Sequence, residues 1–129
     1  MEKGIVVLDA NEEQCQKLCT MLEEWHYPAT PMHSLRDLET YIQASDCRAV
    51  ILDLDTVPVD NRVLRKLKRM DQSLRIMVLS SRPFHPELEE AMSSYIYACL
   101  GKPVDPDELV YWLKTIYEND ANPRRLPQS

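Results

Sequence analysis

Apolar residues gather in short continuous runs along the chain, and each of the stronger runs is followed by a polar residue. These runs are 5–8, 49–52 and 76–79. Asp9, Asp53 and Ser80 follow them directly. A run that is apolar at every position is typical of a strand covered on both faces, as in a parallel sheet. The pattern therefore predicts three central parallel strands.

Between the runs, apolar residues recur every three or four positions, which predicts amphipathic helices. The first such stripe consists of Cys15, Leu18, Cys19, Leu22 and Trp25. Asn11, Ser34 and Asp60 precede three of the stripes and are residue types that cap helix N-termini. The last helix is the clearest, because Asp105 is followed by a proline at the first helical position and by Glu108 three residues on.

Two weaker apolar segments complete the pattern. One is 98–100, and the other lies between Tyr27 and Met32, where two prolines favour an edge strand. A short helix is predicted over 87–93. Strand and helix then alternate five times, which predicts an α/β fold of the flavodoxin-like (βα)5 type, with a doubly wound five-stranded parallel sheet in the order 2-1-3-4-5. In such a sheet, a site forms where the carboxyl ends of the first and third strands meet.

Length and charge restrict the function. The 129 residues (15.0 kDa) suit one domain, which we assign to 1–118, with 119–129 as a flexible tail. The net charge of -6 argues against direct binding of nucleic acid. No apolar stretch approaches the roughly 20 residues of a membrane span. Four cysteines without a C-x-x-C pair indicate a reducing compartment, so we expect a cytoplasmic protein in which Cys15 and Cys19 are core residues rather than zinc ligands.

Polar side chains end four of the predicted strands. They are Asp9, Asp53, Ser80 and Lys102. Because parallel strands carry their carboxyl ends to one edge of a sheet, we expect these side chains to converge there. Such a set suits transfer of a phosphoryl group to a carboxylate, with Asp53 as the nucleophile. Asp9 would help to hold a divalent cation, and Ser80 and Lys102 would bind the phosphoryl oxygens.

Four segments carry a resemblance to a known family. They are 5–13, Asp53 with Pro58 beyond it, 78–81 and 102–109. With them, the chain from Lys3 to about Glu118 resembles the receiver domain of two-component response regulators, as in chemotaxis regulators. The resemblance implies that Asp53 is the phosphoacceptor of a sensor histidine kinase or phosphotransfer protein, and that the bond between Lys102 and Pro103 is cis, a form that only X-Pro bonds adopt at low cost.

The same resemblance implies a cofactor and partners. Mg²⁺ would be held at the acceptor by Asp9, Asp53 and Asp55. A downstream effector protein would bind the switched surface, and a homodimer is a further possibility that the resemblance raises. The protein would accept a phosphoryl group and catalyse its own phosphorylation and dephosphorylation, without being an enzyme that turns over a separate substrate.

The chain departs from the family pattern near this site. Ala10 stands where the family carries the second of two adjacent acids, so we expect Mg²⁺ to bind weakly. The spacing from Asp53 to Pro58 is one residue longer than usual. Cys99 occupies the position of an aromatic residue that moves with the hydroxyl residue, and Tyr97, on the same face of the strand, is a candidate substitute.

Two other interpretations stay open at this stage. Residues 53–57 fit the D-x-D-x-[TV] motif of haloacid-dehalogenase-type phosphatases, in which the first Asp is the nucleophile and the second the general acid. Those enzymes need a further acidic strand end after the lysine, whereas a helix and tail follow Lys102. The loss of an acid at Ala10 would also suit a pseudo-receiver, a protein-interaction module without phosphorylation, although Asp53, Ser80 and Lys102 together favour phosphorylation.

Two further groups of residues could contribute a surface. Residues 62–69 contain five basic side chains and no acidic one. They suit either a docking patch for an acidic partner or, more simply, the solvated face of the third helix. Aromatic residues gather in the last strand and helix, where response regulators present a partner or dimer face, although core packing accounts for most of them. They are Tyr95, Tyr97, Tyr111 and Trp112.

Overall fold

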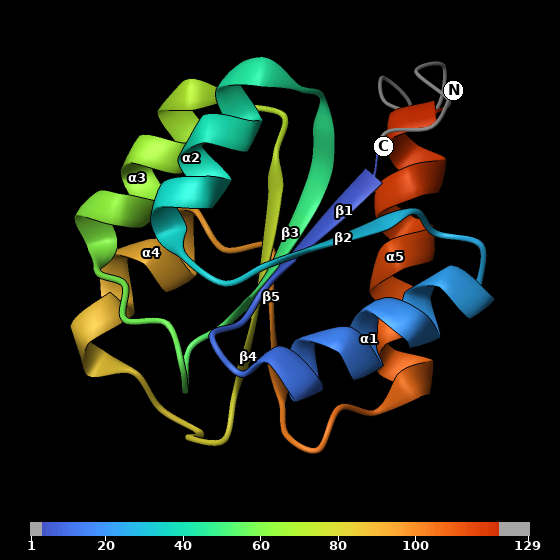
Figure 1. The fold of residues 1–129 in the computed structure, drawn as a ribbon. Helices are drawn as coiled ribbons and strands as arrows, with labels where there is room; N and C mark the ends of the chain where they lie inside the picture. Colours follow the sequence, from blue (N-terminus) through green and yellow to red (C-terminus); the bar gives the residue numbers. More distant parts are fainter. Residues whose placement is uncertain (1–3, 122–129) are drawn as a thin grey trace.

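A single parallel sheet forms the centre of the protein (Figure 1). The computed structural model describes residues 4–121. The strands are β1 (Gly4–Leu8), β2 (Ala29–Met32), β3 (Cys47–Asp53), β4 (Arg75–Ser80) and β5 (Ala98–Gly101). Their order is β2-β1-β3-β4-β5, and every neighbouring pair is parallel. The predicted strand order and the flavodoxin-like α/β class are therefore confirmed.

Helices connect the strands and begin where the capping residues predicted. The helices are α1 (Glu12–Glu24), α2 (Leu35–Ala44), α3 (Asn61–Met70), the 3-10 turn η1 (Pro86–Leu88), α4 (Glu89–Ser94) and α5 (Pro106–Ala121). The side chains of Asn11, Ser34 and Asp60 each accept a hydrogen bond from the backbone N–H three residues on, at 3.0, 3.2 and 2.9 Å. These bonds satisfy N–H groups that the first turn of a helix leaves without an intrahelical partner.

The segment before β5 differs from its prediction. A single helix was expected over 87–93, but the segment opens with the 3-10 turn η1 and becomes α-helical only in α4. The N–H of Leu88 donates to the carbonyl of His85 at 3.0 Å, which is the i to i+3 bond that defines a 3-10 turn. Pro86 opens this turn, where a residue without an N–H loses no bond.

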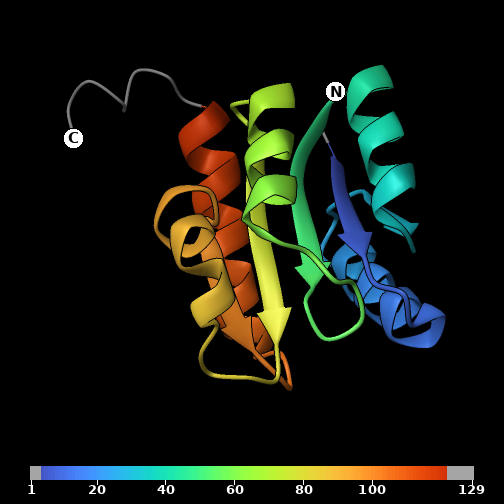
Figure 2. The same cartoon turned by 90° about the vertical axis from the view of Figure 1, so that its left-hand side faces the viewer.

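Helices cover both faces of the sheet, α1 and α5 on one and α2, α3 and α4 on the other (Figures 1 and 2). Two cores result, and alternate residues of each central strand enter opposite cores. In β3, Ile51 packs in the core beneath α1 and α5, and Val50 packs in the core beneath the other helices. This two-sided burial explains why the runs are apolar at every position. Cys15 and Cys19 are buried in the first core, as predicted.

Strand β2 forms one edge of the sheet, and helix α5 is the last element of the domain. β2, which contains Pro31, lies at the edge of the sheet as its proline content predicted. Helix α5 continues to Ala121, beyond the predicted boundary at 118, and residues 122–129 of the predicted tail lie outside the described residues. None of the described helices combines the length and the apolar character needed to cross a membrane.

Candidate functional site

The carboxyl ends of the strands collect at one edge of the sheet, the edge at which the arrowheads of β1, β3 and β4 point in Figure 2. Asp9 directly follows β1, Asp53 and Ser80 end β3 and β4, and all three are buried. Lys102 directly follows β5. The fold therefore brings the four sequence-predicted residues to a common edge, and Asp53 and Lys102 pair directly there.

Asp53 lies at the centre of the site and is 1% exposed. Its Oδ1 accepts hydrogen bonds from the backbone N–H groups of Asp55 (2.9 Å) and Thr56 (3.1 Å). Its Oδ2 forms an ion pair with the ammonium of Lys102. Donors to Oδ1 hold the carboxylate in one orientation, so Oδ2 is the oxygen that faces the loop after β5.

Lys102 is shared between two carboxylates. Besides Asp53, its ammonium pairs with Oδ2 of Asp55 at 3.0 Å. Burial alone would lower the pKa of Lys102, but the hydrogen bonds to both carboxylates outweigh burial and raise the pKa above its usual value. Burial alone would raise the pKa of Asp55, but bonds from Lys102 and Ser81 outweigh burial and hold the pKa below its usual value. Both groups are therefore charged at neutral pH.

Two residues that the sequence analysis did not place at the site complete it. The hydroxyl of Thr56 donates to Oδ1 of Asp9 at 2.9 Å and accepts from the backbone N–H of Ala10 at 3.0 Å. The side-chain amide of Gln14 donates to Oδ2 of Asp9 (2.5 Å) and to Oδ2 of Asp53 (2.9 Å). Gln14 comes five residues after Asp9 in the sequence, and this proximity was the only sequence signal for its place at the site.

The side chains as they lie do not fit a bound cation. The predicted Mg²⁺ ligands were Asp9, Asp53 and Asp55, but an amide N–H of Gln14 lies between the first two carboxylates, and Asp55 faces Lys102. Within residues 4–121, no three His, Cys, Asp or Glu side chains gather closely enough to hold a metal ion. A Mg²⁺ site at these residues therefore stays a prediction.

Ser80 is joined to its own loop. Its hydroxyl accepts a hydrogen bond from the backbone N–H of Arg82 at 3.0 Å. The guanidinium of Arg82 in turn lies 2.8 Å from Nδ1 of the buried His85 and pairs with Glu87. Hydrogen bonds and an ion pair thus join the residues of the loop after β4 to one another, and Ser80 lies at the start of this loop.

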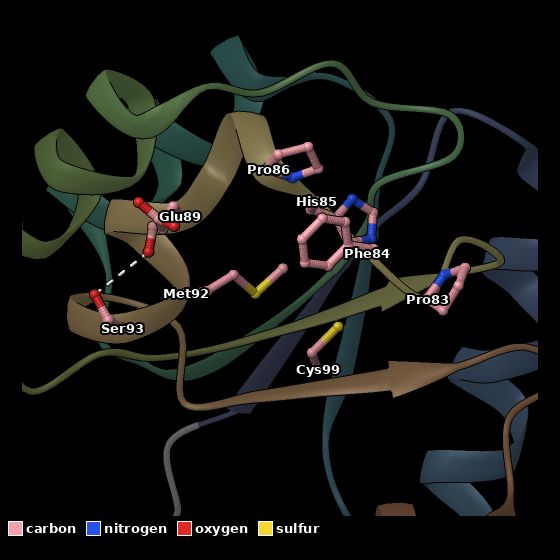
Figure 3. Close-up of a pocket in the computed structure, with 8 residues that line it drawn as sticks. All are labelled: Pro83, Phe84, His85, Pro86, Glu89, Met92, Ser93 and Cys99. Carbon is pink, nitrogen blue, oxygen red and sulfur yellow. Dashed lines mark hydrogen bonds between the residues drawn. The ribbon is translucent and has the colours of Figure 1, made fainter.

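A surface cavity of about 440 Å³ lies beside this loop and is lined in part by Phe84, His85, Met92 and Cys99 (Figure 3). Cys99 projects from β5 into the space below the Phe84 ring in Figure 3, and Phe84 itself is 73% exposed. Tyr97 does not take the place of an aromatic residue here. Its ring packs edge-on against Trp112 of α5, with centroids 5.5 Å apart, and it is not among the residues that line the cavity.

The basic residues of α3 bond mainly within the domain. Arg65 pairs with Glu90 at 2.8 Å and Lys66 with Glu39 at 3.1 Å. Lys68 donates to backbone carbonyls near the end of the helix, at 2.7 and 2.8 Å. This pairing favours the interpretation of the run as a solvated helix face over a docking patch.

Comparison with known proteins agrees with this fold. The family model of the response regulator receiver domain matches residues 5–114, and the chain therefore belongs to this family. Because the chain belongs to the receiver-domain family, we no longer interpret residues 53–57 as a phosphatase motif. A search of curated proteins finds no match to this chain.

Solved structures share the fold at low sequence identity. A CheY-like response regulator receiver domain protein from Methanospirillum hungatei is 15% identical, with a TM-score of 0.82 over 94% of this chain and 98% of that chain. The signal receiver domain of an HD domain-containing protein from Pseudomonas fluorescens is 21% identical, with a TM-score of 0.82 over 96% and 93%. A Burkholderia pseudomallei response regulator, described with a phosphorylated aspartic acid, calcium ion and citrate, is 19% identical, with a TM-score of 0.76 over 99% and 75%.

Proposed function

We propose that this domain receives a phosphoryl group on Asp53 and signals its presence to a protein partner. The observation that carries the proposal is the position of Lys102, whose ammonium pairs with the buried Asp53 carboxylate from the loop after β5. A fixed cation beside a nucleophilic carboxylate stabilises the charge that accumulates as a phosphoryl group arrives. The Burkholderia pseudomallei relative, with its phosphorylated aspartic acid, supports the same assignment by likeness of fold.

In the transfer step, Oδ2 of Asp53 forms a bond to phosphorus. The bond from phosphorus to the donor's leaving atom breaks, and the leaving group keeps its electron pair. The donor is a sensor histidine kinase or phosphotransfer protein, which regenerates its imidazole, or a small acyl phosphate, which releases a carboxylate. Lys102 stays beside the added negative charge. The hydroxyl of Ser80, 2% exposed at the end of β4, would donate to a phosphoryl oxygen after it leaves the Arg82 amide.

The proposed function implies a kind of partner and a cellular location. The domain would act by stoichiometric phosphorylation, and it would catalyse only the gain and loss of its own phosphoryl group. A downstream effector protein would recognise the phosphorylated form in the cytoplasm. The net charge of -6 opposes direct binding of nucleic acid.

The test is chemical labelling of the full chain. Acetyl phosphate, in a buffer with MgCl₂, is expected to add one phosphoryl group that hydroxylamine removes, as mass spectrometry would show. Asp53→Asn is expected to abolish the label. Asp46→Asn, in the exposed loop before β3, is the control and keeps it. Label on another residue would contradict the assignment, and the absence of label with every donor would favour a partner-binding module without phosphorylation.

A further inference from the structure

Gln14 spans the acceptor site with both ends of its side-chain amide. Its Nε2 donates to Oδ2 of Asp9 at 2.5 Å and to Oδ2 of Asp53 at 2.9 Å. Its Oε1 accepts from the ammonium of Lys102 at 3.4 Å. One neutral side chain from α1 is therefore linked to the ends of β1 and β3 and to the loop after β5.

The electrostatics of the site determine which way this amide points. Two carboxylates lie on one side of it and one ammonium on the other. The reverse orientation would direct the carbonyl oxygen at both carboxylates and the N–H groups at the ammonium, and every contact would be repulsive. In the orientation found, the partial positive charge of the NH₂ group lies between Asp9 and Asp53.

The remaining donors leave these two carboxylates well satisfied. The other oxygen of Asp9 accepts from the N–H of Asn11 (2.8 Å) and from the hydroxyl of Thr56 (2.9 Å). Asp53 has two backbone donors on Oδ1 and Lys102 on Oδ2. A carboxylate offers about four acceptor positions, so Gln14 takes up much of what remains. Asp9 and Asp53 are both buried, so without a donor between them their carboxylates would repel each other.

We propose that Gln14 holds the position between Asp9 and Asp53 at which a divalent cation would bind, and that it covers the Oδ2 atom of Asp53. A cation reaches the carboxylates only after Gln14 rotates away. Ala10 makes this arrangement possible, since an acid at that position would add a third negative charge, which one amide balances poorly. The part of the proposal that concerns phosphoryl donors rests on the proposed function, whereas the part that concerns cations does not.

Space for the rotation exists beside the site. A cavity of about 320 Å³ is lined by Gln14, Lys102, Leu18, Met21 and Val104, among others. Gln14 is itself only partly buried. The side chain can therefore leave the carboxylates without unfolding the first turn of α1, at the expense of its two hydrogen bonds to the carboxylates and of the longer one that it accepts from Lys102.

The test is a Mg²⁺ titration of the full chain followed by amide NMR. Gln14→Ala is expected to lower the apparent Kd for Mg²⁺ by about tenfold, because binding no longer has to break the two bonds to carboxylates. The N–H signals of Asp55 and Thr56, which donate to Asp53, report the binding. In the unsubstituted chain, the side-chain NH₂ signals of Gln14 are expected to move toward those of an exposed glutamine as Mg²⁺ is added.

Gln16→Ala is the matched control, since Gln16 lies on the exposed side of α1, where its side-chain amide donates to Thr20 and not to the site. It is expected to leave the Kd unchanged. If Gln14→Ala does not fold, Gln14→Met keeps a long side chain without the donor and is expected to give the same result. Equal Mg²⁺ affinity in the unsubstituted chain and a folded Gln14 variant would overturn the proposal. The titration needs no phosphoryl transfer, so its outcome is separate from that of the Asp53 labelling.

Discussion

The ammonium of Lys102 lies 3.0 Å from Oδ2 of Asp55, although the two residues come from loops at different strand ends. Ser81 adds its backbone N–H (3.2 Å) and its hydroxyl (3.1 Å) to the same carboxylate. Asp55 therefore ties the loop after β5 and the loop after β4 to the loop after β3, which starts directly beyond Asp53. The loops that would surround a phosphoryl group are joined before any group arrives.

Removal of this carboxylate is expected to loosen the three loops. Asp55→Ala leaves Ser81 and Lys102 with fewer partners, and the free energy of unfolding is expected to fall by about 1–2 kcal/mol, because the lost bonds involve a charged group that is partly exposed. Urea denaturation followed by circular dichroism measures the change. Asp46→Ala, at an exposed position, is expected to stay within about 0.5 kcal/mol of the unsubstituted chain. Equal effects in the two variants would contradict the prediction.

Thr56 joins two parts of the site through its hydroxyl, which donates to Asp9 and accepts from Ala10. Thr56→Val keeps the shape but removes both bonds, together with the longer contact of the hydroxyl with Oδ1 of Asp53 (3.4 Å). The expected loss is about 1–2 kcal/mol of unfolding free energy, since a buried carboxylate loses a donor. Thr56→Ser keeps the hydroxyl and is expected to retain most of the stability. The same denaturation experiment compares the two, and a Ser variant as unstable as the Val variant would show that the methyl group matters instead.

An acid at position 10 is expected to change the response to Mg²⁺. Ala10→Asp would add a carboxylate close to Asp9, so the metal-free protein is expected to unfold at a lower temperature because like charges repel. Mg²⁺ would then bind at least fivefold more tightly, since even a quarter of the roughly 4 kcal/mol between charges about 4 Å apart corresponds to that factor. Thermal unfolding with and without MgCl₂ measures both effects. An unsubstituted chain that gains as much from MgCl₂ would contradict the expectation.

The cavity at Cys99 predicts that phosphorylation of Asp53 would change the structure of β5 and α5 only a little. A thiol fills little of the space between Phe84 and Met92, so movement of Ser80 would expose or bury little area there. Tyr97 is held against Trp112 and does not supply the missing ring. Beryllofluoride is expected to shift amide NMR signals mainly in the loops after β3 and β4. Large shifts throughout β5 and α5 would show that another route carries the change.

The link between α3 and α4 predicts a pH dependence. Glu90 accepts from Arg65 and from the hydroxyl of Tyr95 (2.8 Å), and these bonds hold its pKa below the usual value. A carboxyl whose pKa falls on folding stabilises the protein above its unfolded pKa of about 4.3, and this contribution is lost as the pH falls through the folded value. Glu90→Gln is therefore expected to be less stable than the unsubstituted chain at pH 7, and the difference is expected to shrink below about pH 4.

Denaturation at pH 7 and pH 3 measures that difference. Glu89→Gln, one residue earlier on the exposed surface of α4, serves as the control and is expected to show a smaller dependence. A difference between Glu90→Gln and the unsubstituted chain that stays constant from pH 7 to pH 3 would assign the effect to something other than this ionisation.

Sequence predicted most of the fold because its signals are local. Continuous apolar runs marked β1, β3 and β4, and Asn11, Ser34 and Asp60 marked the starts of three helices. The 3-10 turn η1, which begins at Pro86, was missed. The choice between i+3 and i+4 hydrogen bonds depends on how the loop after β4 packs. Asp53 and Lys102 were placed at the site because strand ends in a parallel sheet share an edge.

By itself, then, the sequence determined the order of strands and helices, the core-facing sides of the helices that carry an apolar stripe, and the set of polar residues at one edge of the sheet. The tertiary structure alone decided which of them bond to one another. Gln14 and Asp53 are 39 positions apart, and Gln14 and Lys102 are 88 apart, so no local pattern records their contacts. Those contacts depend on how α1 packs against the ends of β1 and β3, and a hydrogen bond requires donor and acceptor to lie within about 3 Å, which only the packed chain specifies.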